Sequence, residues 1–257
     1  MTRFSPPERV SAEDDRPVGA RTVHAPSLRV AVILVAAGSG VRLGAGMPKA
    51  FAPLCGESLL THALRGVLGC AEVKHVVIVA PPSHVGRCRA AADLLGQHCR
   101  VDVVAGGEDR SASVEAGLGA LRPGDGIVLV HDVARALAPS DLFARVIDAV
   151  RDGHPAVVPG VPVTDTVKVV DNQDCVLDTL DRGSLRSIQT PQGFLRGVLE
   201  LAHAHFEGTL ATDDAGLVER DGGHVHVVAG DHRALKITSP VDLTVATALI
   251  QDGLYAR

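Results

Sequence analysis

The sequence predicts an α/β protein with a doubly wound, mostly parallel β-sheet. Five short segments are almost continuous in Val, Ile, Leu and Ala, a pattern typical of strands that are covered on both faces. Between these segments, apolar residues recur at helical spacing. Strands that alternate with helices in this way favour a parallel sheet with helices on both sides. The expected strands are 30–35, 75–80, 101–104, 127–130 and 156–158.

The expected helices follow from apolar residues three or four positions apart. The periodic residues are Leu60, Leu64, Val67 and Leu68, then Val114, Leu118 and Leu121, then Leu142, Val146, Ile147 and Val150. Ser140 follows Pro139 and is predicted to be the N-cap of the third of these helices. The remaining expected elements are helices over 193–206, 213–221 and 240–250, and strands near 225–228 and 235–238.

One segment interrupts the alternation of strands and helices. Two apolar stretches, 163–170 and 175–180, flank the turn-rich tetrad Asp171-Asn172-Gln173-Asp174 and predict a β-hairpin. From the residues alone, this hairpin is either an ordinary edge hairpin or an arm that reaches a second subunit.

Length, composition and charge limit the class of protein. The chain has 257 residues, of which 46% are hydrophobic, enough for one α/β domain with a sizeable core. No apolar run reaches the roughly 20 residues of a membrane span. A net charge of −5 and only 2% aromatic residues argue against a nucleic-acid polymer as partner. We therefore expect a soluble protein with no membrane or nucleic-acid partner.

Two further features suggest a cytoplasmic protein with an N-terminal extension. The five cysteines form no C-x-x-C pair, which is typical of reduced thiols. Residues 1–28 are rich in Pro and charged residues and contain no apolar signal segment, so we expect a flexible extension there. The domain itself is expected over 29–257.

A glycine-rich loop follows the first expected strand. Leu43 occupies the sixth position of a dinucleotide fingerprint, where Gly is needed, and Pro48 stands where a Walker A loop needs Gly before Lys49. Neither motif is therefore present. Gly38 and Gly40 still allow backbone N–H groups to approach phosphate oxygens, and Arg42 and Lys49 add two positive charges. A phosphate site and a plain turn with solvated charges both remain open, and the position after the first strand favours phosphate.

Two later segments also end strands. Residues 106–113 follow the third strand and lead into a helix, so they form either a surface that reads a base edge or an ordinary capped turn. Asp132 closes the fourth strand in a site otherwise rich in cations. Since Mg²⁺ usually takes one or two carboxylates together with substrate phosphates, Asp132 is a candidate metal ligand. The alternative is a structural salt bridge between Asp132 and Arg135.

Taken in order, these segments resemble the 2-C-methyl-D-erythritol 4-phosphate cytidylyltransferases of the non-mevalonate isoprenoid pathway. The resemblance runs from about residue 30 to the C-terminus. The matching segments are Ala36-Ala37-Gly38-Ser39-Gly40-x-Arg42, Pro48-Lys49, Gly106-Gly107…Arg110…Ser113, His131-Asp132…Arg135, Asp165-Thr166-Val167-Lys168, Thr190-Pro191-Gln192, Thr212-Asp213-Asp214-Ala215 and Lys236-Ile237-Thr238.

The resemblance implies a Rossmann-like fold in which a β-arm, about 163–186, is exchanged within a homodimer. It implies the reaction of CTP with 2-C-methyl-D-erythritol 4-phosphate, a polyol phosphate, to give the CDP-linked alcohol and pyrophosphate, with Mg²⁺ as cofactor. The acceptor phosphate is already an ionised nucleophile, so no strong general base is expected. Catalysis then reduces to positioning and charge neutralisation at the α-phosphate.

The resemblance also implies roles for individual residues. The residues expected to act in catalysis are Arg42, Lys49, Lys236 and Asp132, the last also beside the metal. Those expected to hold the nucleotide are Ala36, Ala37, Gly38, Gly40, Gly107, Glu108, Ser113 and Val133. Those expected to bind the acceptor are Arg135, Thr166, Arg182, Thr190 and Thr212, with the arm residues reaching across from the partner subunit.

The chain departs from the family pattern at a few positions. Val133 stands where the family usually has Ala, and it is expected to keep its backbone donor while adding bulk near the nucleotide. Two rival functions are ribitol 5-phosphate cytidylyltransfer and nucleotide binding without catalysis. Lys168 and the segment Ala36-Ala37-Gly38 favour methylerythritol phosphate over ribitol phosphate, and the retained Arg42 and Lys49 disfavour a non-catalytic homologue. A dehydrogenase is the least favoured alternative, because this chain has Leu43 where the dinucleotide fingerprint needs its third Gly.

Overall fold

The structure is a computed structural model that describes residues 28–38, 47–95, 99–206 and 213–254. The expected flexible extension lies outside the described residues apart from Leu28. Three expected site residues, Gly40, Arg42 and Thr212, also lie outside them.

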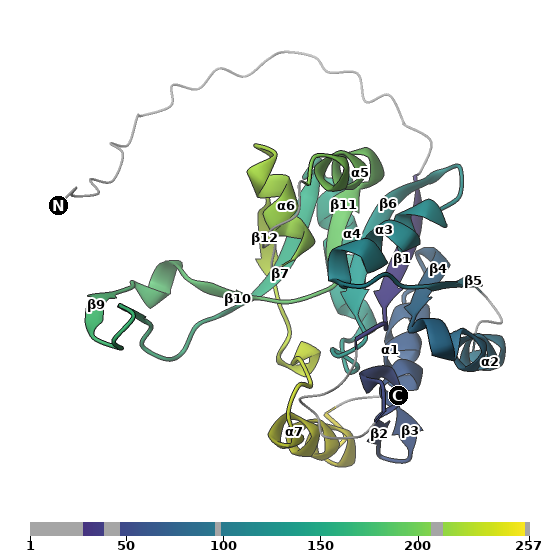
Figure 1. Cartoon of the computed structure of the whole chain (residues 1–257), viewed down its shortest axis with the longest axis horizontal. Helices are drawn as coiled ribbons and strands as arrows, with labels where there is room; N and C mark the ends of the chain where they lie inside the picture. The colour runs from purple at the N-terminus through teal and green to yellow at the C-terminus, as the bar shows by residue number, and fades with distance from the viewer. Residues whose placement is uncertain (1–27, 39–46, 96–98, 207–212, 255–257) are drawn as a thin grey trace.

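A mostly parallel sheet forms the centre of the described fold, as the sequence predicted (Figure 1). Its strand order is β10-β7-β11-β6-β1-β4-β5, with β12 paired to β7. Strand β1 lies between β4 and β6 and is parallel to both, while β11 runs antiparallel to β6 and β7. The strands are β1 (Arg29–Val35), β4 (Val73–Ala80), β5 (Arg100–Ala105), β6 (Asp125–Asp132), β7 (Ala156–Pro162), β10 (Arg186–Ile188), β11 (Gln192–Leu195) and β12 (His226–Ala229).

Helices cover both faces of this sheet, which explains the continuous apolar strands. Alternate residues of β1 show this: Val32 packs in the core on the side of α1 and α4, and Ile33 packs in the core on the side of α3 and α5. A third, smaller core joins α7 to the segment around Leu54. The helices are α1 (Leu59–Leu68), α2 (Val85–Leu95), α3 (Arg110–Gly119), α4 (Ser140–Arg151), α5 (Arg196–Ala204), α6 (Asp214–Arg220) and α7 (Pro240–Gln251).

Shorter elements connect these layers. Four 3-10 turns occur among the described residues, and a two-stranded ribbon of β2 and β3 precedes α1. They are η2 (Lys49–Phe51), η3 (Pro82–His84), η4 (Arg182–Ser184), η5 (His232–Ala234), β2 (Pro53–Leu54) and β3 (Glu57–Ser58).

Three local predictions were wrong. The N-cap of α4 is Pro139 without a side-chain cap, and Ser140 is the first helical residue. The segment expected to begin a helix at residue 193 first forms β11, because Phe194 fills the core and the segment pairs with both β6 and β7. Residues 235–238 form no strand. Their backbone contact to the sheet region is a single hydrogen bond from the Ile237 N–H to the Ala134 carbonyl.

The predicted hairpin is confirmed, with shorter strands than expected. It consists of β8 (Lys168–Val170) and β9 (Val176–Thr179), which pair antiparallel in a sheet of their own. The hairpin projects from the body of the molecule (Figure 1). No helix in the described part of the chain combines the length and apolar character needed to cross a membrane.

Candidate active site

A cavity of about 390 Å³ opens where β1 and β6 end. The carboxyl ends of parallel strands are the usual ligand position in such sheets. Five segments contribute to the lining: β1, η2, the start of α3, the end of β6 and the segment before α7. They are Val35, Ala37, Gly38, Lys49, Gly107, Glu108, Asp109, Arg110, Ser113, Asp132, Val133, Ala134 and Lys236.

Close packing explains the two glycines before α3. A Cβ at Gly106 would lie 2.7 Å from the Ala37 side chain and 2.8 Å from the Ser113 hydroxyl. A Cβ at Gly107 would lie 2.4 Å from the Ala112 side chain. The glycines therefore let the backbone of this turn form one wall of the cavity directly beside the end of β1.

Lys49 enters the cavity from the turn η2. Its backbone N–H donates to the Gly38 carbonyl over 3.3 Å, which ties η2 to the end of β1. The last residue of the turn, Phe51, anchors it to the body of the protein. Its ring stacks on His84 with 5.1 Å between the ring centroids, and the ring centroid lies 4.2 Å from the Arg87 guanidinium carbon. The base of the Lys49 side chain is thus fixed from two sides.

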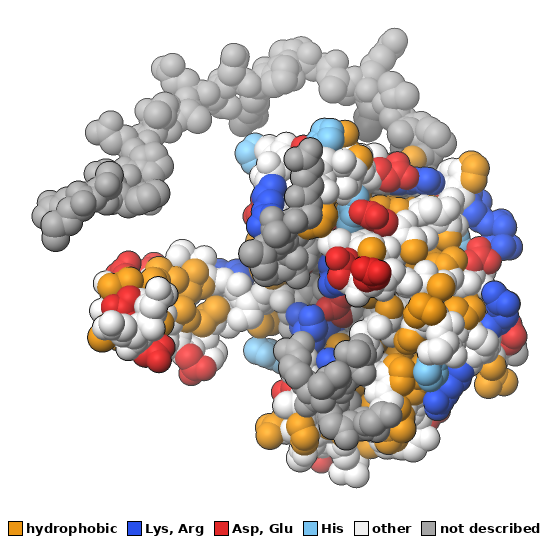
Figure 2. Space-filling model, in the orientation of Figure 1, with side chains coloured by type: hydrophobic (Ala, Val, Ile, Leu, Met, Phe, Trp, Pro, Cys, Tyr) orange, Lys and Arg blue, Asp and Glu red, His pale blue; other side chains and the backbone are white. Residues whose placement is uncertain are grey.

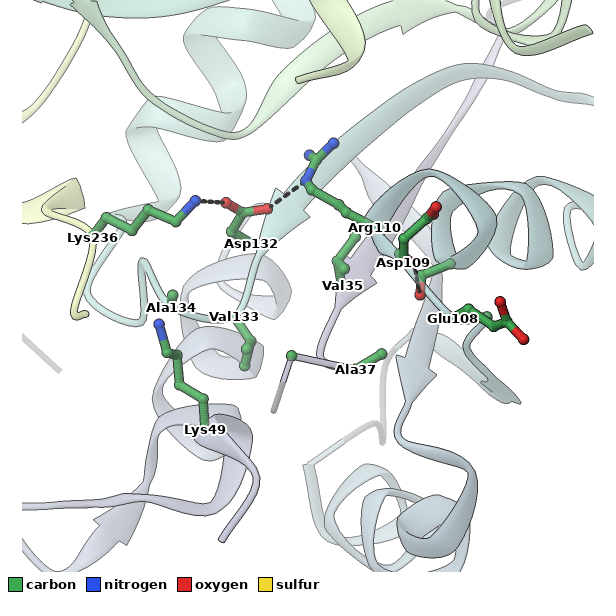
Figure 3. Close-up of a pocket in the computed structure, with 13 residues that line it drawn as sticks. Val35, Ala37, Lys49, Glu108, Asp109, Arg110, Asp132, Val133, Ala134 and Lys236 are labelled. Atoms are coloured by element: carbon green, nitrogen blue, oxygen red, sulfur yellow. Dashed lines mark hydrogen bonds and ion pairs between the residues drawn. The ribbon is translucent and has the colours of Figure 1, made fainter. Parts of the chain in front are cut away.

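Asp132 lies between two cations at the end of β6 (Figure 3). Its Oδ2 is 2.8 Å from the Lys236 Nζ, and its Oδ1 is 3.3 Å from the Arg110 Nε. Burial alone would raise the pKa of this carboxyl, but the charges of Arg110 and Lys236 outweigh it and hold the pKa well below its usual range. Asp132 is therefore ionised throughout the physiological pH range.

A second cavity of about 270 Å³ adjoins the first and shares Arg110, Asp132 and Lys236 with it. Arg135 and Thr190 also line it. The Arg135 guanidinium donates only to the backbone carbonyls of Ala234 and Ile188 in the hydrogen bonds described, at 2.8 and 3.1 Å, and burial lowers its pKa from the ordinary value. The structural Asp132–Arg135 salt bridge is absent from the ion pairs of the described residues.

A buried histidine supports the end of β6. His131 is fully buried, and its Nδ1 lies 3.0 Å from the Thr190 Oγ1, which also accepts the Asp132 N–H at 3.1 Å. Burial is the main cause that lowers the pKa of His131 to about 4. The imidazole is consequently neutral at neutral pH and acts as part of the scaffold behind Asp132.

The structure brings most of the expected residues together and leaves others apart. Lys49, Asp132 and Lys236 line one cavity, as do most of the expected nucleotide-binding positions. Ala36 is fully buried and lies outside the lining, and its N–H donates to the Val79 carbonyl.

Val133 lines the cavity, but its N–H donates to the Val35 carbonyl over 3.1 Å. The expectation that it keeps a backbone donor for the nucleotide was therefore wrong. Thr166 and Arg182 both belong to the arm segment and line neither cavity.

Arg110 is the main residue to which the sequence analysis gave no role. It begins α3 and lines both cavities, and it contacts Asp132 and Asp214. The sequence did contain an indication of this role, because Arg110 stands in one of the segments that match the family. Its partner Asp214 lies on α6, however, and only the folded chain brings the two together.

A divalent cation fits the residues present. The described residues contain no group of three or more His, Cys, Asp or Glu side chains that could hold a metal by themselves. Asp132 is ionised and is the carboxylate that lines both cavities among the described residues, the arrangement expected where substrate phosphates complete a Mg²⁺ site.

The fold and the site define the class of protein. The described lining of a cavity at the carboxyl ends of parallel strands brings Lys49, Lys236 and Arg110 together with the carboxylate of Asp132. This combination is typical of a nucleotidyltransferase that neutralises phosphate charge.

Comparisons with known proteins identify the family. The family model described as IspD, 2-C-methyl-D-erythritol 4-phosphate cytidylyltransferase, matches residues 30–252, and the chain belongs to this family. The chain is 48% identical to the Saccharopolyspora erythraea enzyme of that name, over 87% of this chain and all of the relative. It is 50% identical to the bifunctional enzyme IspD/IspF of Clavibacter michiganensis subsp. michiganensis, over 86% of this chain but only 54% of that relative.

Solved structures give the same result. A 4-diphosphocytidyl-2C-methyl-D-erythritol synthase from Anaerococcus prevotii matches with a TM-score of 0.76 and 29% identity, over 86% of this chain and 98% of that one. The 2-C-methyl-D-erythritol 4-phosphate cytidylyltransferase from Thermus thermophilus matches with a TM-score of 0.68 and 34% identity, over 85% and 98%.

Proposed function

We propose that this chain transfers CMP from CTP to 2-C-methyl-D-erythritol 4-phosphate and releases pyrophosphate, with Mg²⁺ held at Asp132. Family membership gives the reaction. The observation that carries the residue assignment is the pair of adjoining cavities that share Arg110, Asp132 and Lys236. One cavity can take the nucleotide and the other the acceptor, with the reacting phosphates meeting at the shared residues.

The nucleotide fits the cavity beside β1. The Ser113 hydroxyl donates to the Asp109 carbonyl over 2.7 Å, so its remaining lone pairs can accept from an amino group such as that of cytosine. The backbone of Gly107 forms the adjacent wall. The triphosphate then extends toward Lys49 and Asp132, where positive charge and the metal-type carboxylate lie.

The chemical step requires positioning more than proton transfer. An oxygen of the acceptor phosphate forms a bond to the α-phosphorus of CTP, and the bond from that phosphorus to the bridging oxygen breaks, so that pyrophosphate leaves. Lys49 and Lys236 neutralise the charge that develops on the phosphates. Mg²⁺ held by Asp132 would supply additional positive charge to offset that of the phosphates.

The acceptor fits the second cavity. Arg135 is fixed there by two backbone carbonyls, which leaves a half-buried guanidinium with a net charge to offer a phosphate. Thr190 lies beside it. We assign the rest of the acceptor site to Thr166 and Arg182 from the arm of a second copy, because within one chain the arm residues line neither cavity.

A homodimer built through the arm would cover its exposed apolar side chains, which gather on the projecting segment (Figure 2). These side chains are between 38% and 65% exposed, and a cluster of exposed apolar side chains is typical of an interaction surface. They are Val169, Val170, Val176, Leu177 and Leu180. We place the dimer in the cytoplasm, because free cysteines are typical of that compartment.

A pyrophosphate-release assay tests the proposal. The purified chain is incubated with CTP and Mg²⁺ and either 2-C-methyl-D-erythritol 4-phosphate or ribitol 5-phosphate. We expect release with the first acceptor and little with the second. Release only with ribitol 5-phosphate would overturn the acceptor assignment, and CTP binding without release from either would support a non-catalytic protein.

A further inference from the structure

The guanidinium of Arg110 contacts two carboxylates that differ in their exposure and in their position relative to the cavities. Its Nη1 lies 2.7 Å from the Asp214 Oδ2, and its Nε lies 3.3 Å from the Asp132 Oδ1. Asp132 lines both cavities, and its side chain is 11% exposed. Asp214 lines neither cavity, and its side chain is 1% exposed. Asp214 thus lies behind Arg110 and outside the described lining of both cavities.

Three elements fix the orientation of Asp214. It is the first residue of α6, whose N-cap Asp213 accepts the Gly216 N–H. Its Oδ1 lies 3.0 Å from the Nε2 of His203 on α5, which is itself buried. The N–H of the following residue donates to the Oε1 of Gln192 on β11 at 3.2 Å. A carboxylate held in this way is a rigid anchor for its partner.

The positive charge of Arg110 explains why this side chain needs Asp214 as an anchor. Burial opposes the positive charge of Arg110, and the attraction of Asp214, followed by that of Asp132, raises the pKa of the guanidinium above its usual value. A metal bound by Asp132 would draw that carboxylate away from Arg110. The Arg110 side chain is only 29% exposed, and a largely buried cation without a partner is destabilising, so a second and permanent carboxylate keeps Arg110 in place.

We propose that Asp214 is a positioning residue for cytidylyl transfer, which anchors Arg110 so that Asp132 can exchange this partner for the metal without a rearrangement of the site. This role rests on the proposed binding of metal and triphosphate at Asp132. Asp214 itself lines neither of the two cavities proposed for the substrates.

The test compares Asp214→Asn with a matched control, Asp125→Asn. Asp125 is an equally buried carboxylate that contacts a buried histidine, His75, at 2.7 Å, but it lies at the start of β6, the opposite end of the sheet from the site. We expect Asp214→Asn to lower kcat about ten- to a hundredfold, the usual effect of removing a supporting partner. The KM for CTP should stay within about threefold, because binding contacts are retained.

Three further measurements separate positioning from a loss of stability. Calorimetric titration of Mg²⁺ into the enzyme–CTP complex should show weaker binding for Asp214→Asn, by about tenfold, and no change for Asp125→Asn. Asp214→Glu keeps the charge and should recover part of kcat; it also serves if Asp214→Asn does not fold. In an Arg110→Gln background, Asp214→Asn should cause little additional loss of kcat, since the two residues act as a unit.

The outcomes that overturn the role are distinct from those that overturn the function. Equal kcat and equal Mg²⁺ affinity in Asp214→Asn and Asp125→Asn, with an active wild-type chain, would remove the positioning role alone. A full additional loss in the Arg110→Gln background would show that Asp214 acts by another route. A wild-type chain that releases no pyrophosphate with any acceptor would overturn the proposed function and this role together.

Discussion

Replacing Asp132 by asparagine keeps the shape of the side chain and removes its charge from between Arg110 and Lys236. The two cations then repel one another across the mouth of both cavities, and the metal loses its proposed protein ligand. We expect kcat to fall by two powers of ten or more, equivalent to about 3 kcal/mol of lost transition-state stabilisation.

The expected loss of folding stability is smaller, and the structure gives the reason. Breaking a buried ion pair usually costs about 3–5 kcal/mol, because a charge is left without a partner. Here Arg110 keeps Asp214 at 2.7 Å, and the Lys236 side chain is 45% exposed and can be solvated. We therefore expect a loss of about 1–2 kcal/mol in the free energy of unfolding, within the range of ordinary single substitutions.

Pyrophosphate release at saturating CTP, acceptor and Mg²⁺ measures the first effect, and urea denaturation measures the second. Asp102→Asn is a suitable control, because Asp102 also contacts a cation, Arg100 at 2.8 Å, but belongs to β5 and lines neither cavity. Turnover of the Asp132→Asn protein within about tenfold of wild type would refute the assignment of Asp132 to the reacting phosphates.

Three other predictions follow from the site, the arm and the buried histidine. Lys49→Ala should lower kcat by two powers of ten or more, about 3 kcal/mol, and near-normal turnover would count against its catalytic role. Mixed dimers of Lys49→Ala and Arg182→Ala subunits should regain activity through one intact site, whereas no recovery despite proven subunit exchange would remove the contribution of the arm in trans. The pKa of His131, about 4 when folded and about 6.5 when unfolded, makes the unfolded chain bind more protons between these values. The stability that neutral His131 contributes is therefore complete above about pH 6.5 and is lost as the pH falls toward 4, by up to about 3 kcal/mol. Denaturation at several pH values should show a flatter dependence for His131→Asn and an unchanged one for the exposed-residue control His224→Asn; equal slopes in wild type and His131→Asn would contradict this reasoning.

The sequence was most informative where physical causes are local. Strands such as β1 and β4 are continuous in apolar residues because helices cover both their faces, so they could be recognised directly. The meeting of Lys49 and Asp132 in one cavity follows from the rule that the carboxyl ends of parallel strands share an edge.

Elements that depend on tertiary context were harder to predict. Helix α2 buries only Cys88 and Ala92 among its described residues, so it has no broad apolar stripe to detect. Three of the four residues of β11 were assigned to a helix, since this segment becomes a strand only through pairing with neighbours on both sides. The Arg110–Asp214 contact joins two helices that are far apart in the chain, and nothing in the local sequence of either indicates it.

The backbone of the site shows the same limit. Val133 was expected to offer its N–H to the nucleotide, whereas the fold uses that group to bond the Val35 carbonyl. A residue type and its place in a motif do not reveal which of its polar groups are already satisfied within the protein.

A crystal structure of the chain with CTP and Mg²⁺ would test the central claim most directly. We expect the triphosphate in the cavity beside β1, between Lys49 and Lys236, with the metal bound to an oxygen of Asp132. A nucleotide bound at another surface, with Asp132 still paired to Arg110 and Lys236 and distant from the phosphates, would contradict it.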